Sequence, residues 1–477
     1  MHDHPSHGPD HGDATTRRPW TTLALLVVAQ FMVVLDITIV NVALPSIGRA
    51  LDVAPADLQW VVTAYVLCSG GLLLIGGRAA DVLGRRRIFL AGLLLFTTAS
   101  LASGLAPSAG ALIAARAVQG VGAALLTPAA LSILTTTYHG PQRATALSVW
   151  GAVASAGVAV GVVLGGMLTT WLSWEWIFLV NVPVGLATAA LAPRALPPGD
   201  GIERHGDRTL DVPGALAVVA GLVVLVYALS GAAEYGWGSA RTLGLLALAA
   251  GLLAAFIAVE RVVARPLVPP AVWRVGTLRT GTAMMLGVTG ILAGAFFLNS
   301  LYLQRVLGWS ALDTGLGFIP LVVAISLGVH GTSHLIGRVG SRVLVAGGLT
   351  LVAAGALLLA LAPDDARYAA DLLPGFLVLG LGVGLTFPAV SITALSRVDH
   401  ERAGLASGLM STAHEVGAAL GVAALSAIAT GSGLGASAAG YGDACLAAAV
   451  VAGLLGAVAA FALPAVRPAP GVQVAMH

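Results

Sequence analysis

Fourteen apolar segments long enough to cross a bilayer follow one another along this sequence, and they constrain the fold more than any other feature. A helix needs about 20 apolar residues to span the hydrocarbon core. Charged residues make up 10% of the 477, and the mean hydropathy is +0.92. The sequence therefore predicts an all-α polytopic membrane protein. The segments are 21–45, 58–77, 88–107, 110–136, 144–171, 175–193, 212–230, 242–260, 281–303, 314–336, 343–362, 371–395, 403–430 and 441–463.

The basic residues indicate how these segments are oriented. All 24 are arginines, and 19 of them fall on the cytoplasmic side if the N-terminus is cytoplasmic. The positive-inside rule asks for such an excess. We therefore expect a multi-pass protein of the plasma membrane with both termini in the cytoplasm. A twelve-span arrangement would keep the same charge distribution, but segments 212–230 and 242–260 are too apolar to favour it.

The absence of lysine excludes two kinds of chemistry. A Walker A loop needs a lysine at the phosphates, and a Schiff-base site needs a lysine amine. No metal cluster or nucleophile–base pair is apparent either, so we do not expect an enzyme or a bound cofactor. Cys68 and Cys445 lie far apart in apolar runs and are interpreted as packing residues. The polar N-terminus is interpreted as a disordered tail. Weak metal binding by its four histidines is the alternative.

An internal repeat divides the chain into two halves. At an offset of 256 residues, Gly84 matches Gly340 and Arg86 matches Arg342; at 260, Gly120 matches Gly380. Parallel repeats of this kind form transporters whose halves rock around a central site. The expected organisation is a cytoplasmic N-terminal tail (1–19), a six-helix half (20–193), a linker with two additional helices (194–279), a second six-helix half (280–464) and a cytoplasmic C-terminal tail (465–477).

Two charged residues lie within the predicted spans of the first half. Asp36 is in the first span, and a carboxylate at this depth costs about 2.5 to 3.5 kcal/mol on insertion scales. Arg116 is in the fourth span, which runs in the opposite direction. At about 1.5 Å per residue, both lie roughly 9 to 14 Å below the outer surface. The sequence thus predicts that they can meet, either as a proton-linked switch or as a pair that only stabilises the helices.

Other polar and aromatic residues in the spans are weaker candidates. Glu415 is a second acid in a span and follows His414, while His330 lies toward the cytoplasmic end of its span. An isolated histidine in a membrane is more often a hydrogen-bonded packing residue. A substrate cavity lined by polar and aromatic side chains is a further hypothesis, although such residues are more often core. The candidates for it are Asn41, Tyr65, Trp150, Phe296, Asn299 and His414.

Glycine patterns indicate positions where the two halves move. The link 76–87 holds Gly77, Asp81, Gly84, Arg85 and Arg86, and we interpret it as a cytoplasmic latch between the halves. A positive-inside anchor is the alternative, which the partial echo around Arg342 disfavours. In the fifth span, glycines four residues apart leave a bare helix face that permits close packing. Packing alone explains this face as well as a gating role does; its residues are Gly157, Gly161 and Gly165.

Together these motifs resemble the fourteen-span drug:proton antiporter branch of the major facilitator superfamily. The resemblance covers nearly the whole chain. Val162 departs from it, because the family usually has a proline there, and Glu175 stands where arginine is common. The matching residues are the first-span motif 35–45, Gly77, Asp81, Gly84, Arg85 and Arg86 of the loop signature, Arg116, Gln119, Gly120 and Gly122 of the fourth span, Gly157, Gly161, Gly165 and Gly166 of the fifth, and the link 174–183.

The resemblance implies a fold and a function. The fold would be two six-helix halves plus two inserted central helices, working as a monomer in the lipid bilayer. The function would be export of amphipathic, often cationic compounds in exchange for protons, with the proton gradient as energy source and no nucleic-acid partner. Asp36 would be a proton or cation site, Arg116 its partner and Glu415 a second acid. The alternatives are an exporter of one endogenous metabolite and, in another class, a non-transporting receptor or scaffold.

Overall fold

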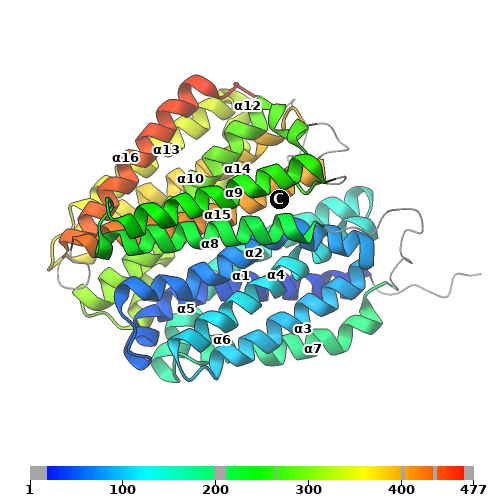
Figure 1. Ribbon diagram of the computed structural model, residues 1–477, viewed down its shortest axis with the longest axis horizontal. Coiled ribbons are helices and arrows are strands. Elements are labelled where there is room, and N and C mark those ends of the chain that lie inside the picture. The colour runs from blue at the N-terminus through cyan, green and yellow to red at the C-terminus, as the bar shows by residue number, and fades with distance from the viewer. Residues whose placement is uncertain (1–18, 198–210, 264–265, 399–402, 433–437, 467–477) are drawn as a thin grey trace, which may run out of the picture.

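The computed structural model describes residues 19–197, 211–263, 266–398, 403–432 and 438–466 (Figure 1). These residues contain 14 helical segments long and apolar enough to cross a membrane. Each corresponds to one of the fourteen segments expected from the sequence, so the predicted fold class is confirmed. The predicted terminal tails lie almost entirely outside the described residues.

Each half consists of six spanning segments, and the halves lie one above the other in Figure 1. Some spans are assembled from two successive helical pieces. The N-terminal half contains α1 (Pro19–Ala50), α2 (Pro55–Leu83), α3 (Arg85–Gly104), α4 (Ala109–Thr137), α5 (Gly140–Trp171), and α6 (Trp176–Leu179) followed by α7 (Asn181–Ala195). The C-terminal half contains α10 (Gly276–Leu301) with the π-helical turn η2 (Tyr302–Val306), α11 (Ala311–Gly317) with α12 (Ile319–Val339), α13 (Ser341–Ala360), η3 (Tyr368–Leu372) with α14 (Leu373–Leu395), α15 (Ala403–Gly431) and α16 (Ala439–Ala462).

The inserted pair, α8 (Val212–Tyr235) and α9 (Ala240–Val262), crosses the front of the molecule in Figure 1. α8 packs against both α2 and α15, and α9 packs against α8. The approach to α2 is close, because a Cβ on Gly71 would lie 2.5 Å from a methyl carbon of Val219. A short 3₁₀ turn, η1 (Pro270–Arg274), leads into α10. The insertion thus covers the seam where α2 of one half meets α15 of the other.

The internal repeat is visible as matching helix contacts. A Cβ on Gly122 would lie 2.6 Å from the amide nitrogen of Phe96, and a Cβ on its counterpart Gly382 would lie 2.7 Å from that of Val352. Gly84 and Gly340 end α2 and α12 with φ values of 98° and 81°, which favour glycine. The two halves therefore use small residues at the same helix crossings.

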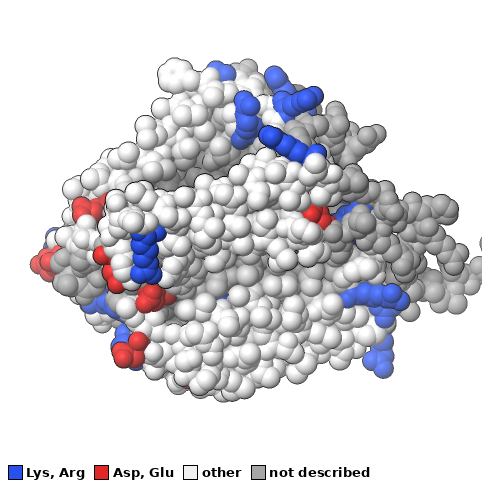
Figure 2. Space-filling model, in the orientation of Figure 1, with Lys and Arg blue, Asp and Glu red and all other residues white. Residues whose placement is uncertain are grey.

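The exposed charges separate toward the two ends of the molecule. Figure 2 shows arginines mainly at the right-hand end and carboxylates mainly at the left. The right-hand end includes the junctions α2–α3 and α12–α13, which carry the arginine-rich loop and its echo. This separation agrees with the orientation that the arginine count predicts.

The first helix is longer than the predicted segment 21–45, because it continues through Pro45 to Ala50. A proline inside a helix provides no N–H for the carbonyl four residues earlier. That carbonyl belongs to Asn41, and the hydroxyl of Ser300 in α10 donates to it at 2.5 Å. The side-chain amide of Gln304 donates to the next carbonyl, of Val42, at 2.8 Å. The other half of the molecule thus supplies the hydrogen bond that Pro45 removes.

Candidate functional site

The Asp36 carboxylate lies at the centre of a polar cluster inside the N-terminal half. Both Asp36 and Arg116 are 0% exposed. The Arg116 guanidinium donates to Asp36 Oδ2, and Gln119 Nε2 donates to Asp36 Oδ1 at 2.8 Å. Asn181 Nδ2 donates to the same Oδ1 at 3.2 Å. The prediction that Asp36 and Arg116 meet is confirmed.

Helix geometry explains how α4 supplies two hydrogen-bond donors to Asp36. Arg116 and Gln119 are three residues apart, so their side chains lie on one face of the helix. Gln119 Oε1 accepts from Arg116 Nη1 at 2.8 Å, and the carbonyl of Val61 in α2 accepts from Arg116 Nε at 3.0 Å. The guanidinium carbon lies 4.3 Å from the centre of the Tyr65 ring. A carboxylate, a carbonyl, an amide and an aromatic face thus surround the arginine.

Asn181 and Ser100 complete the cluster, and the sequence analysis missed both. Asn181 Nδ2 also contacts Ser100 Oγ at 3.2 Å, and that hydroxyl donates to the carbonyl of Phe178 at 2.9 Å. A polar residue in the apolar run 176–184 is a signal that would have found Asn181. It stands at the start of α7, where the break after α6 directs the chain toward α1 and α3.

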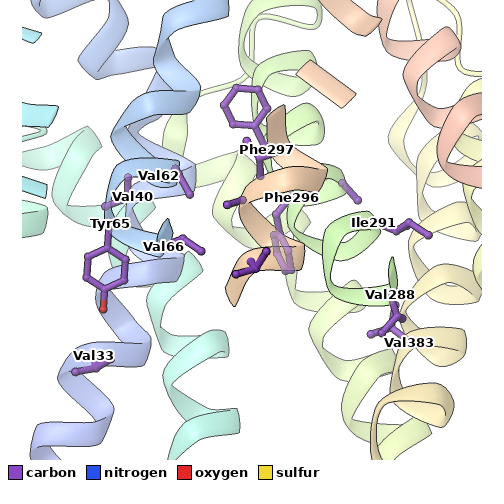
Figure 3. Close-up of a cluster of buried hydrophobic side chains, with 14 of the residues drawn as sticks. Val33, Val40, Val62, Tyr65, Val66, Val288, Ile291, Phe296, Phe297 and Val383 are labelled. Carbon is purple, nitrogen blue, oxygen red and sulfur yellow. The ribbon is translucent and has the colours of Figure 1, made fainter. Parts of the chain in front are cut away.

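The surroundings of the cluster are apolar. Figure 3 shows Tyr65 among Val33, Val40, Val62 and Val66 of α1 and α2. These four valines are buried, and the Tyr65 hydroxyl makes no hydrogen bond to the described residues. Removing one partner of a buried ion pair leaves an uncompensated charge and costs about 3 to 5 kcal/mol. Neutralising Asp36 by a proton would therefore change the balance of contacts between α1 and α4.

The glycine face of α5 packs directly against α1 on both sides of Asp36. A Cβ on Gly157 would lie 3.0 Å from Val34, one on Gly161 would lie 1.9 Å from Thr38 Oγ1, and one on Gly165 would lie 2.9 Å from Ile39. The predicted close packing is confirmed. α5 runs without a break through Val162, where the family commonly has a proline.

The same helix also reaches the other half. A Cβ on Gly166 would lie 2.7 Å from the Cα of Leu312 in α11, and the Leu312 amide donates to Thr170 Oγ1 at 3.2 Å. Together with the bonds from Ser300 and Gln304 to α1, these contacts join the halves at the end opposite the arginine-rich loops. We call this set of contacts the outer seal: α1 with α10 and η2, and α5 with α11.

Glu415 occupies a different place from Asp36. It lies in α15 where that helix crosses α2, and a Cβ on Gly70 would lie 2.3 Å from the Glu415 Cβ. Its carboxylate accepts from Ser69 Oγ at 3.3 Å and makes no ion pair with a described residue. The neighbouring His414 ring packs edge-on against Phe387, with ring centres 5.5 Å apart. The structure therefore separates the second acid from the ion pair and puts it in the seam between the halves.

The residues predicted to line a cavity do not form one group. Tyr65 packs on Arg116, and Asn299 accepts a hydrogen bond from Tyr441 at 2.8 Å. Phe296 packs on Phe318, with ring centres 5.0 Å apart, and Trp150 is buried. Asn41 donates to the carbonyl of Ile37. A cavity of about 370 Å³ contains none of the six candidates; it is lined by Trp309, Asp313, Leu316, Gly317, Pro320 and Tyr368.

The arginine-rich loop contacts a neighbouring helix of its own half. Asp81 lies 3.9 Å from Arg85 one helical turn further on; Asp81 is exposed and Arg85 is half-buried. Arg86 donates to the carbonyl of Pro193 at the end of α7. Its counterpart Arg342 likewise donates to the carbonyl of Leu463 at the end of α16. Gly77 has room for a Cβ, whose nearest contact would be 3.7 Å from Pro128. The gating role of this loop stays a prediction.

Cys68 and Cys445 are both free, as expected for packing residues. In the part of the chain that the structure describes, six spans precede the inserted pair and six follow it. Two repeated helical halves with a buried ion pair in one of them are the architecture of a secondary membrane transporter.

Comparison with known proteins identifies the family. Residues 26–422 match the Major Facilitator Superfamily. The puromycin resistance protein of Streptomyces alboniger is 44% identical over 421 residues, which cover 87% of this chain and 82% of that protein. The cephamycin export protein of Amycolatopsis lactamdurans is 43% identical over 433 residues, 89% of this chain and 88% of that protein. The multidrug resistance protein Stp of Mycobacterium tuberculosis is 35% identical over 399 residues, 83% of this chain and 73% of that protein.

This chain belongs to the Major Facilitator Superfamily, a family of membrane transporters. The similar proteins are antibiotic and multidrug resistance or export proteins. The resemblance read from the sequence motifs is thereby confirmed.

Proposed function

We propose that this protein exports small amphipathic antibiotic-like molecules across the plasma membrane in exchange for protons. The names of its relatives support drug export. The observation that carries proton coupling is the fully buried Asp36–Arg116 pair, whose acid lies in α1, one of the helices of the outer seal. The function of a receptor or scaffold does not require a buried ion pair beside a glycine-rich helix crossing.

The coupling follows from the packing around Asp36. When Asp36 is ionised, it holds Arg116 of α4, Gln119 of α4 and Asn181 of α7 against α1. A proton on Asp36 removes the ion pair, so α1 is held less firmly to α4. Because α1 also packs on the glycine face of α5, a shift of α1 reaches both parts of the outer seal. Proton entry down a 100 mV potential supplies roughly 2.3 kcal/mol per charge for this change.

We further propose that Glu415 is the acid that meets the substrate. It lies in the seam between the halves and accepts a hydrogen bond from Ser69, without a neutralising cation among the described residues. The charge of a cationic substrate could pair with this carboxylate, because no described arginine pairs with it. If Glu415 pairs with the substrate in this way, the exported compounds are amphipathic cations. The protein is proposed to work as a monomer with both termini in the cytoplasm, which agrees with the distribution of exposed arginines.

A second candidate is a dedicated exporter of one endogenous compound. The names of two relatives, for puromycin resistance and cephamycin export, each refer to a single compound. Breadth of substrate distinguishes the two candidates.

Efflux from cells tests the proposed function. Cells that produce the protein are loaded with each of a panel of cationic dyes and antibiotics, and efflux is measured with and without a protonophore. Export of several compounds that the protonophore stops supports multidrug export. Export of one compound alone favours the dedicated exporter. Absence of any protonophore-sensitive efflux, at a surface level equal to that of an active relative, would contradict both.

A further inference from the structure

A pair of histidines on α12 lies outside the site described above. His330 and His334 are four residues apart, and their Nε2 atoms lie 3.1 Å from each other. Both residues are exposed, and their rings are nearly perpendicular, with centres 4.7 Å apart. They lie on the face of α12 opposite the residues that pack against α14. We propose that this pair binds one transition-metal dication such as Ni²⁺, Cu²⁺ or Zn²⁺.

The geometry of the two nitrogens carries the proposal. Imidazole nitrogens bind these metals at about 2.0 to 2.1 Å. The two nitrogens are 3.1 Å apart. An ion bound to both would make an N–metal–N angle of roughly 95 to 102°, between the octahedral and the tetrahedral angle. Two histidines one helical turn apart are the spacing by which helices bind zinc. The separation of the two nitrogens thus suits one shared ion that replaces the hydrogen bond between them.

The pair lies toward the end of α12 that the arginine count assigns to the cytoplasm. α12 ends at Val339, so His334 is five residues from the cytoplasmic end and His330 is nine. These separations correspond to about 8 and 14 Å along the helix axis. Ser333, next to His334, is also exposed. Water and headgroup oxygens near this end would complete the coordination.

The choice of metal follows from the ligands. Imidazole nitrogen favours Zn²⁺, Cu²⁺ and Ni²⁺, whereas Mg²⁺ and Ca²⁺ require oxygen ligands. The nearby Ser333 hydroxyl is bonded to the carbonyl of His330 at 2.6 Å. Arg338 lies one further turn along the same face and is exposed. Its charge would weaken the binding of a dication, so its removal is expected to strengthen binding.

Metal titration of the full-length protein tests the site. Because the four N-terminal histidines would bind the same ions, all variants carry His2→Ser, His4→Ser, His7→Ser and His11→Ser, without a histidine tag. Calorimetry with Ni²⁺ is expected to show one ion per protein. His330→Ala and His334→Ala are each expected to weaken binding about a hundredfold, because the second imidazole then no longer acts at high effective concentration.

Matched variants separate the pair from other histidines. His139→Ala, at an exposed lone histidine before α5, is expected to leave the affinity unchanged, and Arg338→Gln to increase it. The electron paramagnetic resonance spectrum of bound Cu²⁺ is expected to show hyperfine coupling to two imidazole nitrogens in the parent and to one in His330→Ala. Equal affinity in the parent, His330→Ala and His334→Ala, or no binding below millimolar Ni²⁺, would overturn the proposal.

Discussion

At the scale of single residues, the two halves differ at the place where their helices correspond. The glycine contacts align α10 with α1 at an offset of 252 residues and α14 with α4 at 260. Val288 therefore stands where the first half has Asp36, and Phe376 stands where it has Arg116. Both replacements are buried and apolar. The charged pair thus belongs to one half only, and a proton taken up there acts on one side of the seam.

The ion pair predicts an asymmetry between single and double substitutions. Arg116→Gln leaves Asp36 buried without its cation, which is expected to cost about 3 to 5 kcal/mol of stability. Asp36→Asn combined with Arg116→Gln removes both charges and is expected to recover most of that loss. Thermal unfolding of the purified proteins in detergent measures the difference. A double variant no more stable than Arg116→Gln would show that the pair is not an interacting unit.

Glu415 predicts a change in substrate preference. Glu415→Gln keeps a group that can accept from Ser69 but removes the charge. Export of cationic dyes is expected to fall at least tenfold, about 1.4 kcal/mol, while export of neutral compounds changes less than twofold. Rates in inverted vesicles with matched protein levels give the ratio. If cationic and neutral compounds lose export equally, Glu415 does not recognise the substrate's charge.

At the scale of helices, the crossing of α1 and α5 joins the ion pair to the outer seal. Gly161 faces Thr38, two residues after Asp36, and Gly166 faces Leu312 of the other half. α5 is thus in contact with the region of Asp36 and with the opposite half within about two turns. The Asn41 carbonyl, which lacks a helical partner because of Pro45, adds a second link, since Ser300 of α10 donates to it.

Substitution at Gly161 tests this crossing. A Cβ there would lie 1.9 Å from Thr38 Oγ1, so Gly161→Ala is expected to force α1 and α5 apart and reduce export at least tenfold. Gly251→Ala on α9, where a Cβ meets nothing within 4 Å, is the matched control and is expected to keep normal export. Adding Thr38→Ala to Gly161→Ala removes the clashing oxygen and is expected to restore part of the activity. Normal export by Gly161→Ala would mean that the crossing tolerates separation.

At the scale of the whole molecule, the contacts describe a state whose outer side is closed. Alternating access requires that the outer seal opens during each cycle. The inserted helices α8 and α9 do not enter this seal, because α8 packs on the seam of α2 and α15 and α9 packs on α8. Their place at the side of the bundle explains how two spans can be added without disturbing the repeat.

A cross-link across the outer seal is expected to stop the cycle. Thr170 and Leu312 are in contact across the halves, at 3.2 Å between the Thr170 hydroxyl and the Leu312 amide. Thr170→Cys with Leu312→Cys, in a background with Cys68→Ala and Cys445→Ala, should react with a short bifunctional reagent and lose export. A reducible reagent should allow recovery. The two single-cysteine variants serve as controls, and full export by the cross-linked protein would contradict an opening of this seal.

Much of this architecture was predictable from the sequence, because apolar length and arginine placement are strong signals in membranes. The fourteen spans and the Asp36–Arg116 pair followed from helix rise and depth alone. The glycine face of α5 predicted close packing but not its partner. The partner depends on how α5 crosses α1, which periodicity does not specify.

The remainder of the site depended on contacts between segments far apart in the chain. Asn181 reaches Asp36 only because α7 starts beside α1, and Gln119 was noted only as part of a motif. Residue type alone does not place the predicted cavity residues, and the structure distributes them among separate contacts. Tyr65, for example, packs on Arg116. A polar or aromatic residue in a span indicates a buried partner, but it does not identify that partner.

The central claim is that Asp36 carries the coupling proton. Purified protein is reconstituted in liposomes holding a pH-sensitive dye, and the proton movement that follows addition of an exported compound is measured for the wild type and Asp36→Asn. The account predicts substrate-driven proton movement in the wild type and its loss in Asp36→Asn, with binding of the compound retained. Proton movement of equal size in Asp36→Asn would contradict it.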